Sequence, residues 1–283
     1  MTATAERGAP QPQIETPVLE FDGVELSFAG VKAIDGVSFT VGGSELFAII
    51  GPNGAGKTSI FNVLSGVYRP QSGSVTFAGT DLIGKRPHEI AELGIARTFQ
   101  NIELFSNLTV LDNLMLGRHH HNTYGVLSSF VWLGKARQCE LLNREAVEDI
   151  IDFLELEQWR RFPVGQLPYG VQKRVELGRA LAMRPKLLLL DEPVAGMNLE
   201  ETEDMARFIL DVKEEWGVTI LMVEHDMGLV MDISDHVVVL NFGQVIARGA
   251  PAEVTANEQV IRAYLGAGDI GQLKARIAGV EAA

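Results

Sequence analysis

Hydrophobic and polar positions along the chain follow two different patterns. Between Val18 and Val41 apolar and polar residues alternate around a Phe-Ala-Gly turn, and Ser74–Gly79 repeats the alternation. A period of two is typical of strands with one buried face, so we expect an antiparallel sheet there. Three other stretches are almost continuously apolar: Leu46–Ile50, Leu187–Leu190 and Val218–Val223. Runs of this kind indicate strands of a parallel sheet buried on both faces.

Helical stretches separate the apolar runs, as βαβ units require. From about Leu108 to Trp159 the chain is rich in Leu, Ala, Glu and Arg, which indicates a mostly helical insert. Another helix is expected from near Gln172 to a stop before Pro185. Terminal helices are expected over Pro251–Leu265 and Ile270–Ala278. The predicted fold class is α/β, with a parallel-sheet core, an N-terminal antiparallel β subdomain and a helical insert.

Composition narrows the possible partners and the compartment. The 24 basic and 37 acidic residues give a net charge of −13, which argues against a nucleic-acid partner because phosphate contacts need clustered Lys and Arg. The single cysteine, Cys139, fits a reducing compartment. No stretch has the 18 or more apolar residues of a membrane span, and residues 1–17 contain three prolines and predict a flexible tail. We therefore expect a cytoplasmic protein.

A glycine-rich stretch follows the first apolar run and precedes a helical one. It has the spacing GxxxxGK[ST] from Gly51 to Thr58. Glycines permit the backbone angles and the close approach that let consecutive N–H groups point at one anion. Lys57 can then reach the β- and γ-phosphates of a nucleoside triphosphate, and the Thr58 hydroxyl can ligate Mg²⁺. The candidate cofactor-binding residues here are Gly51, Pro52, Asn53, Gly54, Ala55, Gly56, Lys57, Thr58 and Ser59; Lys57 is also a catalytic candidate.

Two carboxylates, Asp191 and Glu192, end the four-leucine run. Ligands of open α/β sheets bind at the carboxyl ends of the strands, where these residues are expected to lie. Asp191 suits a role in holding Mg²⁺, and Glu192 suits a role in orienting or deprotonating an attacking water.

The Asp-Glu-Pro sequence after that run, together with the upstream Leu167–Arg174, resembles the ATP-binding subunits of ABC transporters. The resemblance extends over roughly residues 18–266. It implies that Gln100 matches the glutamine that contacts Mg²⁺ or water and senses the membrane subunit. His225 matches the switch histidine that contacts the γ-phosphate, and Phe28 matches the aromatic residue that stacks on adenine. Residues Ala195–Asn198 match the loop that joins two subunits.

The signature of the family is altered in this chain. Residues Leu167–Val171 stand where LSGGQ is usual, with Pro168 in place of serine and Tyr169 in place of glycine, while Gly170 is kept. Gly170 is followed by a helix whose N-terminus could hold the γ-phosphate of an ATP bound to a second subunit, which makes Tyr169 and Gly170 candidate nucleotide-binding residues. The lost hydroxyl, and Asn198 in place of aspartate, leave open a site that binds ATP without hydrolysing it. However, Tyr-Gly signatures are similar to those of branched-chain amino-acid importers.

The resemblance to that subfamily also implies partners. These are ATP and Mg²⁺ as cofactors, integral-membrane permease subunits, a second ATPase subunit (an identical copy or a paralogue), and indirectly an extracytoplasmic substrate-binding protein. The protein would then lie peripherally on the inner face of the cell membrane. Two alternatives remain: the same role in an importer of urea or short amides, and a soluble ABC ATPase without a membrane partner.

The expected domain organisation follows from these assignments. Residues 1–17 form a flexible tail, residues 18–266 the ATPase domain with its helical subdomain at about 101–167, and residues 267–283 a C-terminal helical tail. The metal-site candidates are Thr58, Gln100 and Asp191. The run His119–His121 is interpreted as a solvated loop, because adjacent histidines on a helix point in different directions.

Overall fold

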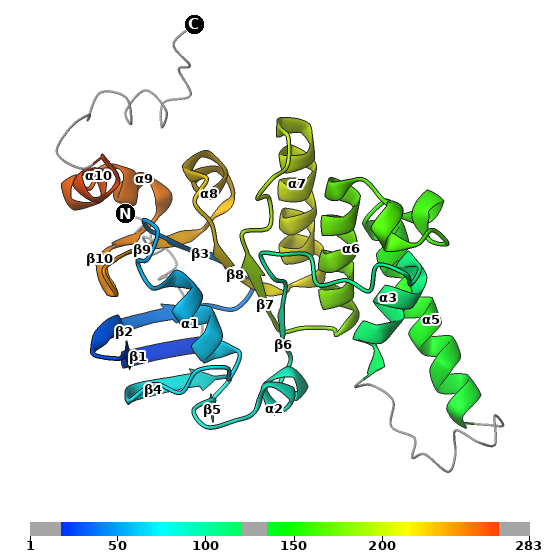
Figure 1. Cartoon of the computed structure of the whole chain (residues 1–283), viewed down its shortest axis with the longest axis horizontal. Helices are drawn as coiled ribbons and strands as arrows, with labels where there is room; N and C mark the ends of the chain where they lie inside the picture. Colours follow the sequence, from blue (N-terminus) through cyan, green and yellow to red (C-terminus); the bar gives the residue numbers. More distant parts are fainter. Residues whose placement is uncertain (1–17, 120–134, 266–283) are drawn as a thin grey trace, which may run out of the picture.

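The computed structural model describes residues 18–119 and 135–265 (Figure 1). A six-stranded sheet runs through the molecule in the order β10-β9-β3-β8-β7-β6. Its strands pair in parallel except β10, which is antiparallel to β9. Their bounds are β3 Leu46–Ile50, β6 Ile95–Arg97, β7 Leu187–Asp191, β8 Thr219–Val223, β9 His236–Asn241 and β10 Gln244–Gly249. The parallel sheet predicted from the three apolar runs is confirmed.

Both faces of this sheet are covered, which explains why β3 is entirely apolar and why β8 and β7 have a polar residue only at one end, Thr219 and Asp191. Along β7, Leu188 and Leu190 pack into one hydrophobic cluster with residues of the helical side of the molecule. Leu187 and Leu189 point the other way, into a second cluster shared with the antiparallel sheet. A strand between two cores needs apolar residues at every position.

A second, antiparallel sheet has the order β2-β1-β4-β5. Its strands are β1 Leu19–Phe28, β2 Val31–Val41, β4 Ser72–Phe77 and β5 Thr80–Asp81. The turn between β1 and β2 contains Ala29 and Gly30 at φ of 47° and 87°. The alternating pattern therefore predicted this subdomain correctly.

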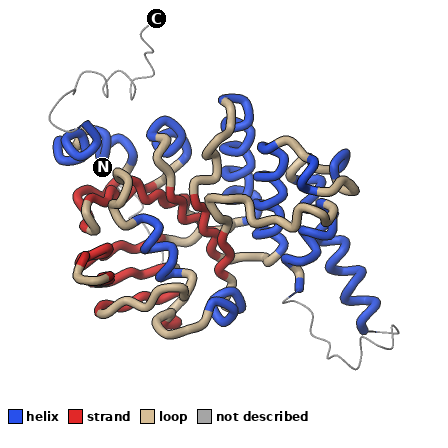
Figure 2. Tube along the Cα trace, in the orientation of Figure 1, coloured by secondary structure: helices blue, strands red, loops and turns tan. Residues whose placement is uncertain are grey.

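The helices within residues 110–216 gather on the side of the molecule away from the antiparallel sheet (Figure 2). The insert predicted from about Leu108 to Trp159 is mostly helical in the residues that the structure describes. The helices are α1 Lys57–Leu64, α2 Pro87–Glu92, α3 Val110–Gly117, α5 Lys135–Phe153, α6 Tyr169–Ala182, α7 Leu199–Trp216, α8 Met227–Ile233, α9 Pro251–Thr255 and α10 Glu258–Leu265, with 3₁₀ turns at Glu157–Trp159 and Val164–Gln166. The sequence pattern of Ile270–Ala278 and the two predicted tails lie outside the described residues.

One predicted boundary was wrong. Helix α6 begins at Tyr169, three residues before the expected Gln172, and Pro168 is its N-cap with φ −55°. Proline suits a helix start because its fixed φ is compatible with the first turn and its missing N–H is not needed there. The helix ends at Ala182, before Pro185, as expected.

No helix within residues 18–119 and 135–265 is both long and apolar enough to cross a membrane.

Candidate functional site

The glycine-rich loop joins β3 to α1, and its shape depends on glycine at two positions. Gly51 and Gly56 have φ of 152° and 106°. A Cβ on Gly51 would lie 2.2 Å from the carbonyl oxygen of Leu240, and one on Gly56 would lie 2.3 Å from that of Ala33. Gly56 is the N-cap of α1 and supplies no side-chain acceptor to the first turn. The loop thus presents an uncapped helix N-terminus, which suits an anion.

Lys57 is folded back onto this loop. Its Nζ donates hydrogen bonds to the carbonyl oxygens of Gly51 at 2.6 Å and Pro52 at 3.2 Å. Burial lowers the pKa of Lys57, and the negative charges of Glu192, Asp191 and Glu224 oppose that shift. A phosphate would offer the same ammonium a charged acceptor in place of two neutral carbonyls.

Asp191 ends β7 and is bound by a buried arginine. Its Oδ2 accepts a hydrogen bond of 2.7 Å from Arg97, and both side chains are at most one-tenth exposed. The other terminal nitrogen of Arg97 donates to Asn62 of α1 at 2.8 Å and to Ser65 Oγ at 3.2 Å. Arg97 therefore connects the carboxyl end of β7 to the helix that follows the phosphate loop.

Glu192 follows Asp191 with φ of 49°, an uncommon backbone conformation for a residue with a side chain. Its Oε2 accepts a hydrogen bond of 2.8 Å from Nε2 of Gln100 and lies 3.7 Å from Nδ1 of His225. Gln100 follows β6 and His225 follows β8. The structure therefore brings three sequence-predicted site residues together at the carboxyl end of the parallel sheet.

The loop that carries His225 is held by Glu224. This side chain is fully buried, and its Oε2 accepts the backbone N–H groups of His225 at 2.8 Å and Asp226 at 3.3 Å. Burial raises the pKa of Glu224, and these backbone hydrogen bonds oppose the shift. The carboxylate thus fixes the path of the chain just after β8.

The altered signature forms the first turn of α6. The hydroxyl of Tyr169 donates to the carbonyl oxygen of Ala195 at 3.0 Å, and its side chain is 42% exposed. A Cβ on Gly170 would lie 2.5 Å from Oε1 of Glu201, so the backbone approaches α7 closely here. Asn198, the N-cap of α7, accepts a hydrogen bond from the N–H of Glu201. Tyr169 therefore rests on the segment that was predicted to join two subunits, and Gly170 lies against Glu201 in the first turn of α7.

Phe28 lies at the end of β1 and is 44% exposed. Its ring contacts Tyr68 edge to face, with centroids 5.0 Å apart. A half-exposed ring fixed in this way offers a face for a planar group to stack on.

The protein offers too few oxygen ligands to bind Mg²⁺ by itself, but it offers enough for a Mg²⁺ ion that is also bound to a phosphate. No cluster of three or more His, Cys, Asp or Glu side chains suited to a metal occurs among the described residues. Thr58 is exposed at the second position of α1, and Asp191 is the nearby carboxylate at the end of β7. Mg²⁺ commonly takes one or two protein oxygens and completes its shell with phosphate and water. His119 is exposed, and His120 and His121 lie outside the described residues.

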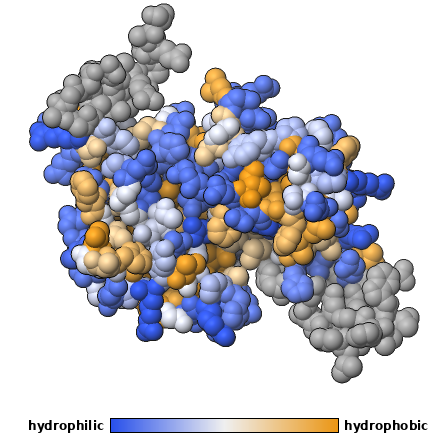
Figure 3. Space-filling view, in the orientation of Figure 1, coloured by the Kyte–Doolittle hydropathy of each residue, from blue (hydrophilic) through white to orange (hydrophobic). Residues whose placement is uncertain are grey.

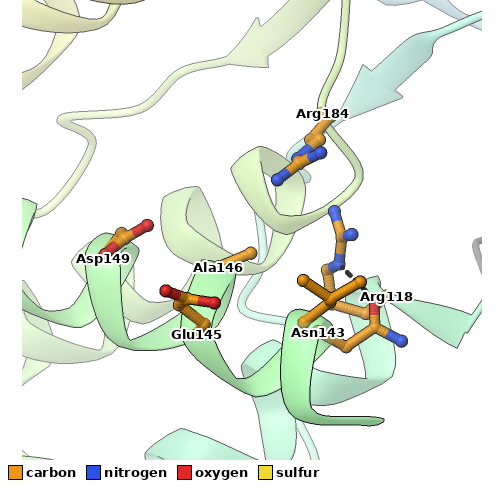
Figure 4. Close-up of a pocket in the computed structure, with 7 residues that line it drawn as sticks. Arg118, Asn143, Glu145, Ala146, Asp149 and Arg184 are labelled. Carbon is orange, nitrogen blue, oxygen red and sulfur yellow. Dashed lines mark hydrogen bonds between the residues drawn. The ribbon is translucent and has the colours of Figure 1, made fainter. Parts of the chain in front are cut away.

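A separate pocket of about 310 Å³ lies among α3, α5 and the connection from α6 to β7 (Figure 4). Arg118 points toward it and donates to Asn143 Oδ1 at 3.1 Å and to the carbonyl oxygen of Ala182 at 3.0 Å. None of the sequence-predicted site residues lines this pocket. The candidate site is therefore the edge of the sheet rather than this pocket.

Several residues that shape the site were missed from the sequence. Arg97 and Glu224 stand next to motif residues, but an isolated charge beside a strand is usually interpreted as solvated. Lys173 and Glu176 are three residues apart on α6, a spacing normally read as a surface ion pair. Their position directly after the signature was the only available signal.

Two family models match the chain. The model described as ABC transporter matches residues 34–195, and that described as Branched-chain amino acid ATP-binding cassette transporter matches residues 244–270.

Named relatives match over most of their length. The chain is 42% identical over 253 residues to the high-affinity branched-chain amino acid transport ATP-binding protein BraF of Pseudomonas aeruginosa, covering 88% of this chain and 98% of that protein. It is 38% identical over 252 residues to the corresponding protein LivG of Escherichia coli, with the same coverage.

A solved structure gives the same answer for the fold. A nucleotide-free ATP-binding cassette from an ABC transporter matches with a TM-score of 0.77 and 33% identity, covering 89% of this chain and all of that one. The phosphate loop, the carboxylates that end β7, and these matches agree. The chain therefore belongs to the ABC transporter family, as an ATP-hydrolysing cassette within its branched-chain amino acid group.

Proposed function

We propose that this chain is the ATP-hydrolysing subunit of an importer that takes up branched-chain amino acids through a membrane permease. The observation that carries the chemistry is the meeting of Gln100, Glu192 and His225 beside the phosphate loop. The cargo is supported by the names of the relatives and by the C-terminal match. These features favour an importer over a soluble ABC ATPase without a membrane partner.

In this proposal the phosphate loop holds the triphosphate. The backbone N–H groups at the N-terminus of α1 donate hydrogen bonds to the phosphates. Lys57 leaves its two carbonyl partners and binds the β- and γ-phosphates. Thr58, Gln100 and Asp191 would hold Mg²⁺, which would neutralise charge that develops on the phosphates. Phe28 stacks on the adenine.

Glu192 is the proposed base. Its carboxylate orients or deprotonates the water that attacks the γ-phosphate. Gln100 fixes one oxygen of that carboxylate, His225 lies 3.7 Å from the same oxygen, and in this proposal His225 contacts the γ-phosphate. The positive φ of Glu192 turns its side chain into this position.

The opposite wall of the site comes from a second subunit, either an identical copy or a paralogue. Tyr169 and Gly170 begin α6, whose N-terminal dipole favours an anion supplied by the facing subunit. ATP binding would close the pair, and hydrolysis would open it. The Tyr169-Gly170 sequence still begins a helix, and Gly170 still lets the backbone lie close to a neighbouring group. We therefore infer that the site hydrolyses ATP rather than only binding it.

The surface near Gln100 to Leu108 is the proposed contact with the permease. Phe99, Phe105 and Leu108 are exposed by 42%, 59% and 37%. Apolar surface gathers over the α3 and α6 side of the molecule (Figure 3). A cytoplasmic helix of a permease would cover such residues, which would place the protein peripherally on the inner face of the membrane. The proposed ATPase domain spans residues 18–266, with a helical subdomain at about 101–167.

The test is uptake of labelled substrate in cells that lack this chain. Deletion should abolish high-affinity uptake of leucine, isoleucine and valine, and the parent gene should restore it. The Glu192→Gln variant should be expressed at the same level without restoring uptake. Urea and acetamide uptake serve as the matched control and should not change. Loss of urea uptake with normal leucine uptake would overturn the cargo assignment while leaving the ATPase role intact.

A further inference from the structure

A buried ion pair lies in the first half of α6, away from any ligand that the proposed function uses. Nζ of Lys173 lies 3.4 Å from Oε2 of Glu176, and both side chains are 2% exposed. Charged pairs three residues apart on a helix usually lie in water. Burying both charges costs free energy that the pair alone often fails to recover, so their remaining hydrogen bonds matter.

Those hydrogen bonds all go to the loop that contains Gln100. Nζ of Lys173 donates to the carbonyl oxygens of Phe99 at 3.3 Å and Gln100 at 2.9 Å. The N–H of Phe99 donates to Oε1 of Glu176 at 3.2 Å. Lys173 and Glu176 thus hold three backbone groups in two consecutive residues, and we call this pair the α6 clamp.

The loop is also attached at two further points. One turn after the clamp on α6, Arg179 donates to the carbonyl oxygen of Glu103 at 2.5 Å. At the other end, the N–H of Thr98 donates to the carbonyl oxygen of Leu189 on β7 at 2.9 Å. The backbone of the loop therefore bridges α6 and the strand that ends at the candidate site.

The side chain of Gln100 completes the chain of contacts. Its backbone is bound by Lys173, while its Nε2 donates to Glu192. The same helix begins with Tyr169 and Gly170. A tilt of α6 would therefore move the signature turn and Gln100 together, relative to Glu192 on the sheet.

We propose that Lys173 and Glu176 are positioning residues that hold Gln100 against Glu192 and make Gln100 and the signature turn move as one body. This inference rests on the proposed roles of Gln100 and Glu192. The clamp touches neither nucleotide nor water; it acts through the backbone of Phe99 and Gln100.

The test is a double-mutant cycle on the purified full chain. Lys173→Met should lower kcat by about tenfold to a hundredfold, as expected when a catalytic group is displaced by roughly 1 Å, with little change in KM for ATP. In a Gln100→Ala background the same substitution should have little further effect, because its action passes through Gln100. A purely structural role would lower activity equally in both backgrounds. Rates are expressed per bound ATP, so that a smaller fraction of folded protein does not lower the measured kcat.

Two further variants protect the test against misfolding. The pair Lys173→Met with Glu176→Met replaces both charges by apolar side chains, which buried ion pairs often tolerate, and it should fold while losing kcat. Lys213→Met, which removes a partly exposed ion pair with Asp235, is the matched control and should retain the parent's kcat. Parent-like kcat in the double-methionine variant would overturn the proposal.

Hydrogen exchange gives a reading that does not depend on activity. Peptides covering residues 97–105 should exchange faster in the double-methionine variant than in the parent and in Lys213→Met, since the N–H of Phe99 loses its acceptor. Unchanged exchange would also overturn the clamp. If the parent itself shows no ATP hydrolysis with its permease, the proposed function fails, and the exchange result still decides whether the clamp exists.

Discussion

The phosphate loop and the start of α6 each bury a lysine, and they hold it in different ways. Lys57 is 8% exposed and donates to two neutral carbonyls of its own loop. Lys173 is 3% exposed and donates to a carboxylate and to the backbone of another segment. The first arrangement lacks a directly bound anion, so a phosphate can improve on it. The second is already complete, and it connects two parts of the protein.

Burial alone therefore does not distinguish a lysine that binds a ligand from one that has a structural role. Burial lowers the pKa of Lys57, while the carboxylates of Glu192, Asp191 and Glu224 act on it without contact. These carboxylates therefore oppose the lowering of the pKa of Lys57 without forming hydrogen bonds to its ammonium. The partners of Lys173, by contrast, occupy the donors of its ammonium.

Glu192→Gln should produce the largest effect, and it tests whether the hydrolysis step depends on the carboxylate beside the phosphate loop. Turnover should fall by about 10²- to 10⁴-fold, the range expected for loss of a general base. ATP affinity should remain close to that of the parent, because the carboxylate is not among the residues proposed to bind the nucleotide. Steady-state hydrolysis and equilibrium binding of labelled ATP would check both. Undiminished hydrolysis would remove Glu192 as the base.

Lys57→Ala compared with Lys173→Met tests the difference between the two lysines directly. Lys57→Ala should lower kcat/KM by about 10²-fold or more, as for loss of one donor to a developing oxyanion, with a small change in the free energy of unfolding. Lys173→Met should cost about 3 kcal/mol of unfolding free energy or more, because it leaves Glu176 buried without its cation. ATP binding and urea unfolding are the measurements. Equal losses of stability in both variants would break the comparison.

Phe28→Ala tests whether this aromatic ring stacks on the adenine of the bound nucleotide. Loss of a stacking partner worth about 0.5–1.5 kcal/mol should weaken ATP binding by roughly 2- to 13-fold while kcat changes little. Phe28→Trp is the matched control and should retain affinity. GTP, whose base also stacks, would be expected to lose a similar factor. A loss confined to kcat would contradict stacking.

Glu224→Gln should have the smallest effect, seen in the pH dependence of stability. Burial raises the pKa of Glu224 above its ordinary 4.5, so the folded protein keeps this proton more readily than the unfolded chain. The resulting stabilisation is present below pH 4.5 and is lost as pH rises through the folded-state pKa. The stability of the parent relative to the variant should therefore decline in urea titrations as the pH rises from 4.5 through the folded-state pKa. A stability difference between parent and variant that grows with pH would contradict a raised pKa for Glu224.

Much of the architecture could be predicted from local patterns. The alternation in β1 and β2, the unbroken apolar run of β7 and the loop at Gly51–Thr58 each reflect one physical requirement, and each was confirmed as structure. The start of α6 was expected near Gln172, three residues too late, although proline at position 168 is well suited to a helix start. The roles of Arg97, Glu224 and Lys173 could not be predicted, because charged residues become buried only when segments distant in sequence meet.

The position of β3 at the centre of the parallel sheet has a consequence for synthesis of the chain. β3 precedes both of its neighbours, β8 and β9, by a long stretch of sequence. At about 5 to 20 residues per second, a ribosome needs roughly 10 to 40 s to make the segment between β3 and β9. During that time Phe47 and Ile49 can pack against the antiparallel subdomain, which is already present. The opposite face, with Leu46 and Ile50, packs against residues that come later in the chain, and the edges of β3 have no strand to pair with until β8 and β9 emerge. Nascent chains would therefore offer chaperones an apolar strand.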